Sequence, residues 1–174
     1  IAGFDGCHFN VSGYQTLAGY LYKQVSREMF GVTQPVSADP PDVVSATFTN
    51  STNTELSVVF NQPVIWPATF NGNDLKDYFY LNTPVTILSG SASGDTVKLQ
   101  LSASSNAYKV TYLPNQYYNG TATNYDGPWL RNPATVGALS FYSFPVSSGL
   151  SISANSPSVC ATGNVILTAN KTGQ

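Results

Sequence analysis

The hydrophobic repeat of this 174-residue chain changes once, and that change limits the folds open to it. Over residues 13–30, large apolar side chains recur at the 3.6-residue spacing of an amphipathic helix. From residue 43 onward, apolar and polar residues alternate with the period of two that a half-buried strand requires. The sequence therefore predicts one helix followed by a mainly β, antiparallel structure.

The predicted helix spans Gly13–Phe30 and carries a single apolar stripe. Ser12 and Gln15 form a capping-box pattern at its start, and Gly31 stands where a left-handed C-cap is expected. Burial of the stripe is worth on the order of 10 kcal/mol, so it must pack against another surface. No other segment has the pattern of a long helix or a parallel strand, so we expect the partner surface to lie outside this chain. The stripe consists of Tyr14, Leu17, Ala18, Leu21, Val25 and Met29.

A proline-rich segment at residues 32–41 excludes a continuing helix and predicts an extended linker. Short strands separated by turn residues then predict an antiparallel, immunoglobulin-like β-sandwich over residues 42–147. Residues 148–174 hold only two more strands, too few for a core, which predicts the start of a further β-module. The predicted strands are Val43–Thr49, Glu55–Phe60, Val85–Leu88, Thr96–Leu101, Ala107–Leu113, Ala138–Phe144, Leu150–Ala154 and Val165–Ala169.

Strand alternation predicts which side chains share a face. In the second strand we expect Ser57 to face outward. The residues of the opposite, inward set are Leu56, Val58 and Phe60, and the same alternation groups Val97 with Leu99 and Leu101, and Tyr108 with Val110 and Tyr112.

Charged residues make up only 9% of the chain, against about 25% in typical soluble domains. This low charge favours a secreted or cell-surface β-rich protein over a cytosolic enzyme. The net charge of −2 and scattered basic residues argue against a nucleic-acid partner, and no apolar run is long enough for a membrane span. Cys7 and Cys160 lack the spacing of a metal site or disulfide framework, and we expect no metal or cofactor. Because the chain starts at Ile1 instead of Met, we expect it to be cut from a longer protein.

The only histidine, His8, lies three residues after Asp5 in a glycine-containing loop ahead of the predicted helix. A carboxylate at this spacing can orient an imidazole, whose other nitrogen then accepts a proton from a serine hydroxyl. Asp-x-x-His alone is a weak pattern. The alternative is a turn aspartate beside a hydrogen-bonded surface histidine.

The run DGCHFNVSGY at residues 5–14 resembles the final conserved block of SGNH (GDSL-like) hydrolases. In that family, Asp-x-x-His is commonly followed by Asn and then by Gly-Tyr on the last helix. The resemblance implies that Asp5 orients the imidazole and that His8 is the general base. Phe9 stands where the family usually has proline. The blocks for the nucleophilic serine and the oxyanion donors have no counterpart here, so residues 1–31 are expected to be the end of a truncated α/β domain.

A second group of candidate residues is aromatic. Tyr and Trp faces beside polar groups form sugar-binding platforms, whereas the alternative is that these side chains belong to core and loop packing. Residues 138–145 are similar to domains that follow esterase domains in secreted bacterial carbohydrate-active proteins. The candidate substrate-binding residues are Tyr112, Tyr117, Tyr118, Tyr125, Trp129 and Arg131.

Residues 151–169 resemble the start of the Ig-like or PKD-like repeats of Bacteroidetes-type surface proteins, which the type 9 secretion route often exports. Together the resemblances imply a secreted bacterial multidomain hydrolase that removes an ester, most plausibly from an acetylated carbohydrate, by serine acyl transfer. The partners they imply are carbohydrate, the remainder of the parent chain and a secretion machinery. The chain alone is expected to be inactive. The competing hypothesis is a non-catalytic surface adhesin or carbohydrate-binding module.

Overall fold

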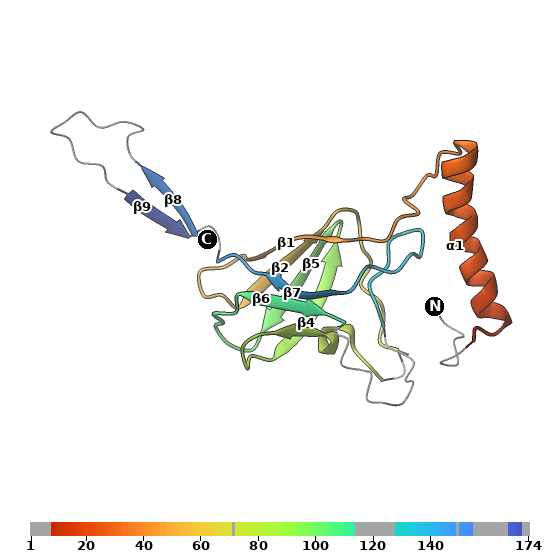
Figure 1. Ribbon diagram of the computed structural model, residues 1–174. Helices are drawn as coiled ribbons and strands as arrows, with labels where there is room; N and C mark the ends of the chain where they lie inside the picture. Colours follow the sequence, from red (N-terminus) through yellow and green to blue (C-terminus); the bar gives the residue numbers. More distant parts are fainter. Residues whose placement is uncertain (1–7, 71, 114–127, 149, 155–166, 172–174) are drawn as a thin grey trace.

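The computed structural model describes residues 8–70, 72–113, 128–148, 150–154 and 167–171. These residues are mainly β, with antiparallel sheets and a single helix, as the sequence predicts (Figure 1). The helix comes first, and residues 31–42 lead from it to the sheets without regular structure. This connecting segment nevertheless lies against the sheets, because Ala38 and Pro41 within it are buried.

Helix α1 spans Val11–Phe30 and ends as the sequence predicts. Gly31 adopts the left-handed conformation with a φ of 64°, and its amide donates to the carbonyl of Arg27 at 3.1 Å. Glycine takes this conformation without the steric cost that a Cβ would add. The predicted C-cap is therefore confirmed.

The larger sheet has four strands in the order β1-β2-β5-β4, each antiparallel to its neighbours. At its centre, Leu56 is paired with Leu99 and Val58 with Val97, so residues of like character meet across β2 and β5. The strands are β1 at Val43–Phe48, β2 at Glu55–Phe60, β4 at Ile87–Ser93 and β5 at Thr96–Leu101.

The second sheet has three antiparallel strands in the order β3-β6-β7. Beyond β7 the chain continues alongside β1, where the amide of Ser147 donates to the carbonyl of Ala46 at 2.9 Å. The strands are β3 at Phe79–Leu81, β6 at Lys109–Tyr112 and β7 at Phe141–Pro145, and the short 3-10 helix η1 at Leu75–Tyr78 precedes β3. Further on, β8 at Leu150–Ala154 and β9 at Leu167–Lys171 pair with each other as a two-stranded sheet.

Three of the predicted strands have the observed bounds, and the others begin or end at different residues. Glu55–Phe60, Thr96–Leu101 and Leu150–Ala154 agree with the observed bounds, whereas β4 lies at Ile87–Ser93 instead of Val85–Leu88. The strand β3 was missed because three residues carry too little alternation to be recognised, and they become a strand only by pairing with β6.

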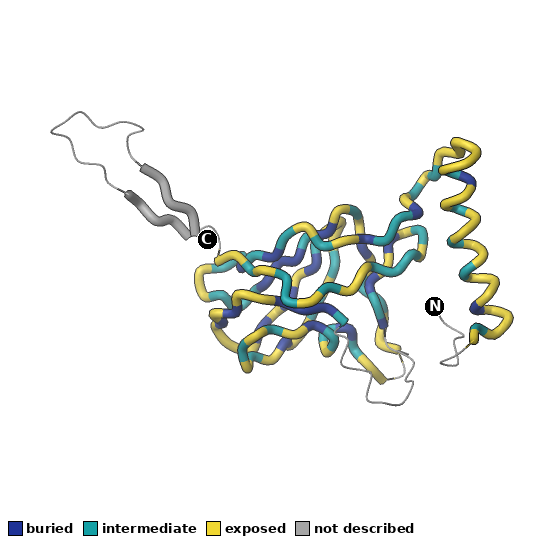
Figure 2. The backbone as a smooth tube through the Cα atoms, in the orientation of Figure 1, coloured by how far each residue is buried: buried dark blue, intermediate teal, exposed yellow. Residues whose placement is uncertain are grey.

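The two sheets share one hydrophobic core, which Figure 2 shows as buried segments gathered between them. Leu56, Val58 and Phe60 are all buried, as predicted. Ser57 was expected to face outward, yet it is 92% buried (8% exposed) because β2 is a central strand flanked by β1 and β5. Tyr108 was grouped with Val110 and Tyr112, but it precedes the first residue of β6 and is exposed.

Gly90 in β4 allows an indole to lie against the strand. A Cβ at this position would stand 1.9 Å from Cη2 of Trp66, and that ring is stacked on Phe79 with 6.1 Å between centroids. We expect Gly90→Ala to lower the free energy of unfolding by about 1–3 kcal/mol in urea titration, because the ring must leave its stack. In a Trp66→Leu background the same substitution should lower the free energy of unfolding much less, because the indole that would clash is absent. An equal cost in both backgrounds would contradict the assigned clash.

Candidate functional site

The start of α1 is built by Asn10, which follows His8 by two positions. The Oδ1 of Asn10 accepts a hydrogen bond from the amide of Gly13 at 3.0 Å. The predicted capping box is therefore wrong, because Ser12 lies inside the helix and donates its hydroxyl to Asn10 at 2.7 Å. An asparagine caps the free amides of a first turn as well as a serine does, so the helix begins earlier than predicted.

His8 is exposed and lies directly before a contact that fixes how the chain enters the helix. The ring of Phe9 meets that of Tyr14 edge-on, with 5.7 Å between centroids. These residues occupy the positions just before the N-cap and at the fourth residue of the helix, where a hydrophobic staple forms. Asp5 and Cys7 lie outside the described residues. The pairing of Asp5 with His8 therefore stays a prediction.

Tyr112, the first of the predicted substrate-binding residues, lies in the core. Its side chain has no exposed surface, and its hydroxyl accepts a hydrogen bond from the amide of Leu130 at 2.8 Å. Its ring stacks on Phe79 with 4.8 Å between centroids. Burial raises the pKa of Tyr112 far above the ordinary range of a phenol. A ring in this position has no face available to a ligand.

Trp129 and Arg131 lie together at the surface. The guanidinium of Arg131 lies over the indole, 4.7 Å from the ring centroid, and Arg131 is exposed. Gly137 approaches the same ring so closely that a Cβ would stand 3.2 Å from its Cδ1 and Nε1. The indole is therefore half-buried between a cation and the backbone, which fits both a packed loop and the edge of a sugar platform. Tyr117, Tyr118 and Tyr125 lie outside the described residues.

Sequence reasoning missed the polar contacts that hold α1 against the sheets. The hydroxyl of Tyr20 donates to the carbonyl of Thr135 at 2.8 Å, and Nζ of Lys23 donates to that of Ala134 at 3.0 Å. Arg27 forms a two-pronged pair with Asp39 at 2.7 and 2.9 Å. These partners are far apart in sequence, so no local pattern could reveal them.

Asn132 ties the connecting segment to the β-region. Its side chain is completely buried, and Nδ2 donates to the carbonyl of Ser37 at 2.8 Å, to that of Asp39 at 3.2 Å and to Oε1 of Gln62 at 3.1 Å. Its Oδ1 accepts from the amide of Val136 at 2.9 Å. Asn132 thereby joins three segments through one buried amide. A buried polar side chain is stable when its donors and acceptor are hydrogen-bonded in this way.

The Arg27–Asp39 pair makes the attachment of α1 dependent on pH. The guanidinium holds the pKa of the Asp39 carboxyl below its ordinary value of 3.8, mainly through their hydrogen bonds. The folded state has the lower pKa, so the stability that the pair contributes is fully present above pH 3.8. That stability is lost as the pH falls through the folded-state pKa of Asp39. We expect Asp39→Asn to lower Tm near neutral pH, and the difference from wild type to shrink as the pH falls below 3.8. A Tm difference that is constant over this range would contradict the assignment.

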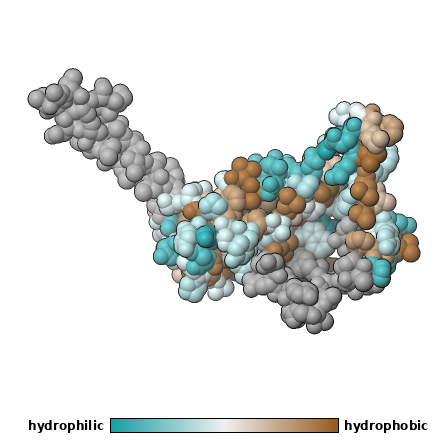
Figure 3. Space-filling model, in the orientation of Figure 1, coloured by the Kyte–Doolittle hydropathy of each residue, from teal (hydrophilic) through white to brown (hydrophobic). Residues whose placement is uncertain are grey.

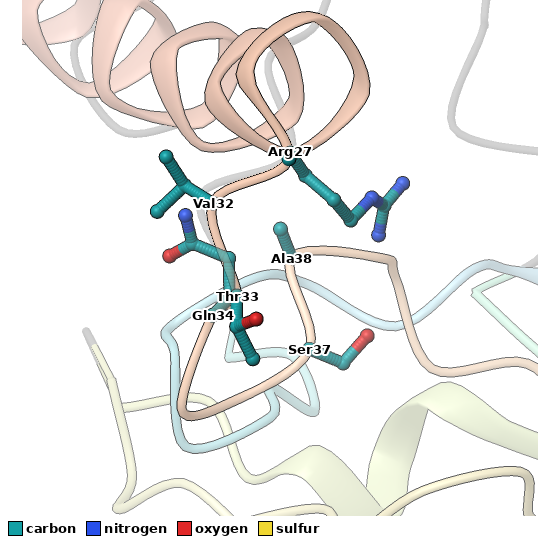
Figure 4. A pocket seen from close by; sticks show the side chains of 7 residues that line it. Arg27, Val32, Thr33, Gln34, Ser37 and Ala38 are labelled. Carbon is teal, nitrogen blue, oxygen red and sulfur yellow. The ribbon is translucent and has the colours of Figure 1, made fainter.

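The end of α1 and the connecting segment enclose an open hollow of about 360 Å³ (Figure 4). Its main polar groups are already engaged, because Arg27 binds Asp39 and Gln34 donates to Ser26 at 3.0 Å. The hollow therefore offers few free groups to a ligand. It is lined by Arg27, Gly31, Val32, Thr33, Gln34, Ser37 and Ala38.

In the part of the chain that the structure describes, no cluster of His, Cys, Asp or Glu has the makings of a metal site. Asp74 instead caps η1 by accepting a hydrogen bond from the amide of Lys76 at 3.1 Å. Among these same residues, no helix has the length and apolarity needed to cross a bilayer. Comparison of the chain with models of protein families, with curated proteins and with solved structures finds no match.

Proposed function

We propose that this chain joins the last loop and helix of an SGNH-type ester hydrolase to an immunoglobulin-like β-sandwich, within a secreted bacterial multidomain protein. The observation that carries the hydrolase assignment is the run DGCHFN at residues 5–10, placed directly before a long amphipathic helix. Asn10 caps that helix and the Phe9–Tyr14 contact fixes its entry, so His8 is carried on a well-defined support. A catalytic imidazole needs such support.

The strand order supports the immunoglobulin-like part of the proposal. With strands lettered along the chain, β1-β2-β5-β4 reads A-B-E-D and β3-β6-β7 reads C-F-G. This is the order of constant-type immunoglobulin domains. The strands β2 and β6, which carry the inter-sheet disulfide in antibody domains, contain no cysteine here, so the likeness is one of topology alone.

In the proposed reaction, His8 takes a proton from a serine hydroxyl supplied by the α/β domain that precedes α1. The serine oxygen attacks the acyl carbon of a carbohydrate ester, and oxyanion donors of that same domain stabilise the charged oxygen. His8 then passes its proton to the departing sugar hydroxyl. Water, deprotonated by His8, releases the acyl group as a carboxylate and restores the serine. Asp5 orients the imidazole throughout.

Trp129 and Arg131 support the choice of a carbohydrate ester. An exposed guanidinium beside a half-buried indole can hydrogen-bond sugar hydroxyls while the ring edge contacts C–H groups. Tyr112 is not part of this proposal, because its ring is in the core.

The test uses a fluorophosphonate probe, which labels an activated serine, and 4-nitrophenyl acetate as substrate. The longer polypeptide that includes the sequence preceding Ile1 should react with the probe and hydrolyse the ester. The chain of 174 residues alone should do neither, since the proposed serine lies outside it. Turnover by this chain that is lost in His8→Ala would show that the site is complete without the preceding domain and would overturn the proposal.

The alternative is a non-catalytic surface adhesin or binding module, in which Asp5 and His8 are structural. It is favoured by the indole of Trp129, which is covered by Arg131 and by the backbone at Gly137 and packs against the core. The sequence preceding Ile1 discriminates between the two. A Gly-Asp-Ser block there supports the hydrolase, and a block without the serine supports the binding module.

A further inference from the structure

One face of α1 is bound to the β-region by side-chain hydrogen bonds and an ion pair. Tyr20, Lys23 and Arg27 follow one another at intervals of three and four residues, so they share a face of the helix. Each contacts the loop at Ala134–Thr135 or the connecting segment at Asp39.

Six of the seven exposed large apolar residues of α1 lie on the opposite face, which we call the outer face; the seventh, Phe30, lies seven positions after Lys23 and shares its side of the helix. Each helical residue advances by about 100°, which places the centre of this set about half a turn from Tyr20, Lys23 and Arg27. Their side chains are 43–75% exposed, and Figure 3 shows hydrophobic residues following α1 along its length. The outer face consists of Val11, Tyr14, Leu21, Tyr22, Val25 and Met29.

This orientation is the reverse of the usual one. A helix at the surface of a folded domain normally turns its apolar stripe toward the core and its polar side to water. Here α1 contributes none of the core residues of the β-region among those that the structure describes. The outer face is therefore a candidate interface with another body.

The size of the outer face favours a neighbouring domain of the same polypeptide over a second copy of the chain. Six such side chains offer about 400–700 Å², if each contributes the area that corresponds to 1.5–3 kcal/mol. Two copies joined face to face would bury about 800–1,400 Å² in total, below the mean of about 1,600 Å² and reaching only the lower part of the 1,200–2,000 Å² range of stable complexes. Interfaces between domains of one chain span about 600–1,500 Å² and gain from covalent linkage.

The charges on α1 argue against a membrane as the occupant. A helix that lies on a bilayer directs its lysines and arginines to the lipid headgroups beside its apolar face. Lys23 and Arg27 are instead turned away from the outer face and are engaged by Ala134 and Asp39.

We infer that the outer face of α1 seats a second folded domain of the same polypeptide, and that α1 holds this domain and the β-region in one fixed orientation. The inference rests on the proposed function only for the identity of that domain as the hydrolase. The helix is as long as a small domain is wide, about 30 Å, so its whole outer face can be covered by one such body. The polar face meanwhile keeps the β-region in place.

The first experiment measures the oligomeric state of the 174-residue chain by sedimentation velocity, at about 1–50 µM protein. The expected result is a monomer that binds a hydrophobic dye. A stable dimer that becomes monomeric on Val25→Asp would show that a second copy covers the outer face and would overturn the inference. The matched control is Gln24→Asp, which changes an exposed neighbour outside the outer face.

The second experiment compares hydrogen exchange of α1 in this chain and in the longer polypeptide that includes the preceding sequence. We expect the α1 amides to exchange at least about tenfold more slowly in the longer form, and Leu21→Asp to remove that difference while Gln24→Asp keeps it. Equal exchange in both forms would overturn the inference. This experiment does not measure enzymatic activity. A protein that is inactive but shows the slower exchange would therefore refute the proposed hydrolase and still support the interface on α1.

Rotational correlation times from NMR relaxation test the fixed orientation. In the longer polypeptide the two domains should tumble with a single correlation time, and Arg27→Ala should separate the two values. Two different correlation times in the unaltered protein would overturn the rigid attachment.

Discussion

Replacing His8 with alanine in the longer polypeptide of the proposed hydrolase should lower kcat by about 10⁴-fold or more toward an aryl acetate. Loss of the general base leaves only the catalysis that an oxyanion hole and substrate binding provide, which is why a single triad substitution costs this much. The measurement is the rate of 4-nitrophenol release at saturating substrate. Tm of the variant is measured in parallel, and an unchanged Tm shows that the loss reports chemistry instead of unfolding.

The matched variant is Asp5→Asn, which keeps the shape of the side chain but removes the charge that is proposed to orient the imidazole. Its effect should also be large, and the double variant should be no slower than His8→Ala alone, because the proposed mechanism makes the two residues act as one unit. Additive losses would mean that Asp5 and His8 act separately. A His8→Ala protein with unchanged kcat would remove His8 from the proposed mechanism.

Replacing Asn132 with aspartate should lower the free energy of unfolding by about 3–5 kcal/mol. The substitution keeps the shape but turns the Nδ2 donor into a carboxylate oxygen. That oxygen would face the carbonyls of Ser37 and Asp39 and the Oε1 of Gln62, with no hydrogen to share among them. Urea unfolding followed by tryptophan fluorescence measures the loss, and Tm should fall by about 4–8 °C for each kcal/mol.

The same variant should become more stable relative to wild type as the pH falls. A buried carboxyl that lacks a cation has a raised pKa, so its penalty is present above the unfolded-state pKa and is relieved when the group is protonated. The control is Asn106→Asp, the same change at an exposed position, which should stay within about 0.5 kcal/mol of wild type. Equal effects at both positions would show that the buried amide of Asn132 does not hold the segments together.

Local features of this protein were predictable where a local cause produces them. The helix and its C-cap follow from a 3.6-residue repeat that ends at Gly31. The bounds of β2 and β5 follow from alternation, because their inward residues face one continuous core. The N-cap was misjudged because Asn10 and Ser12 are both good caps, and only the entry of the chain fixed by Phe9 and Tyr14 decides between them.

The candidate sites were less predictable, because burial separates residues that look alike in sequence. Tyr112 and Trp129 both belonged to one aromatic group, yet Tyr112 lies wholly in the core, whereas Trp129 is half-buried and packs against the outside of that core. The hydrogen bond from the Leu130 amide fixes Tyr112 inside, and that partner is 18 positions away. Alternation along a strand carries no information about such a partner.

The sequence alone determined the kinds of elements, their order and the presence of an apolar stripe on the helix, since each depends on repeats and caps within a few residues. Only the tertiary structure decided that the stripe faces away from the β-region, that Asn132 joins the connecting segment to it and that Tyr112 is core. The physical reason is that polar groups buried on folding must form hydrogen bonds with partners from other segments of the chain. The pairs of Arg27 with Asp39, and of Asn132 with Ser37 and Gln62, form only once those segments have come together.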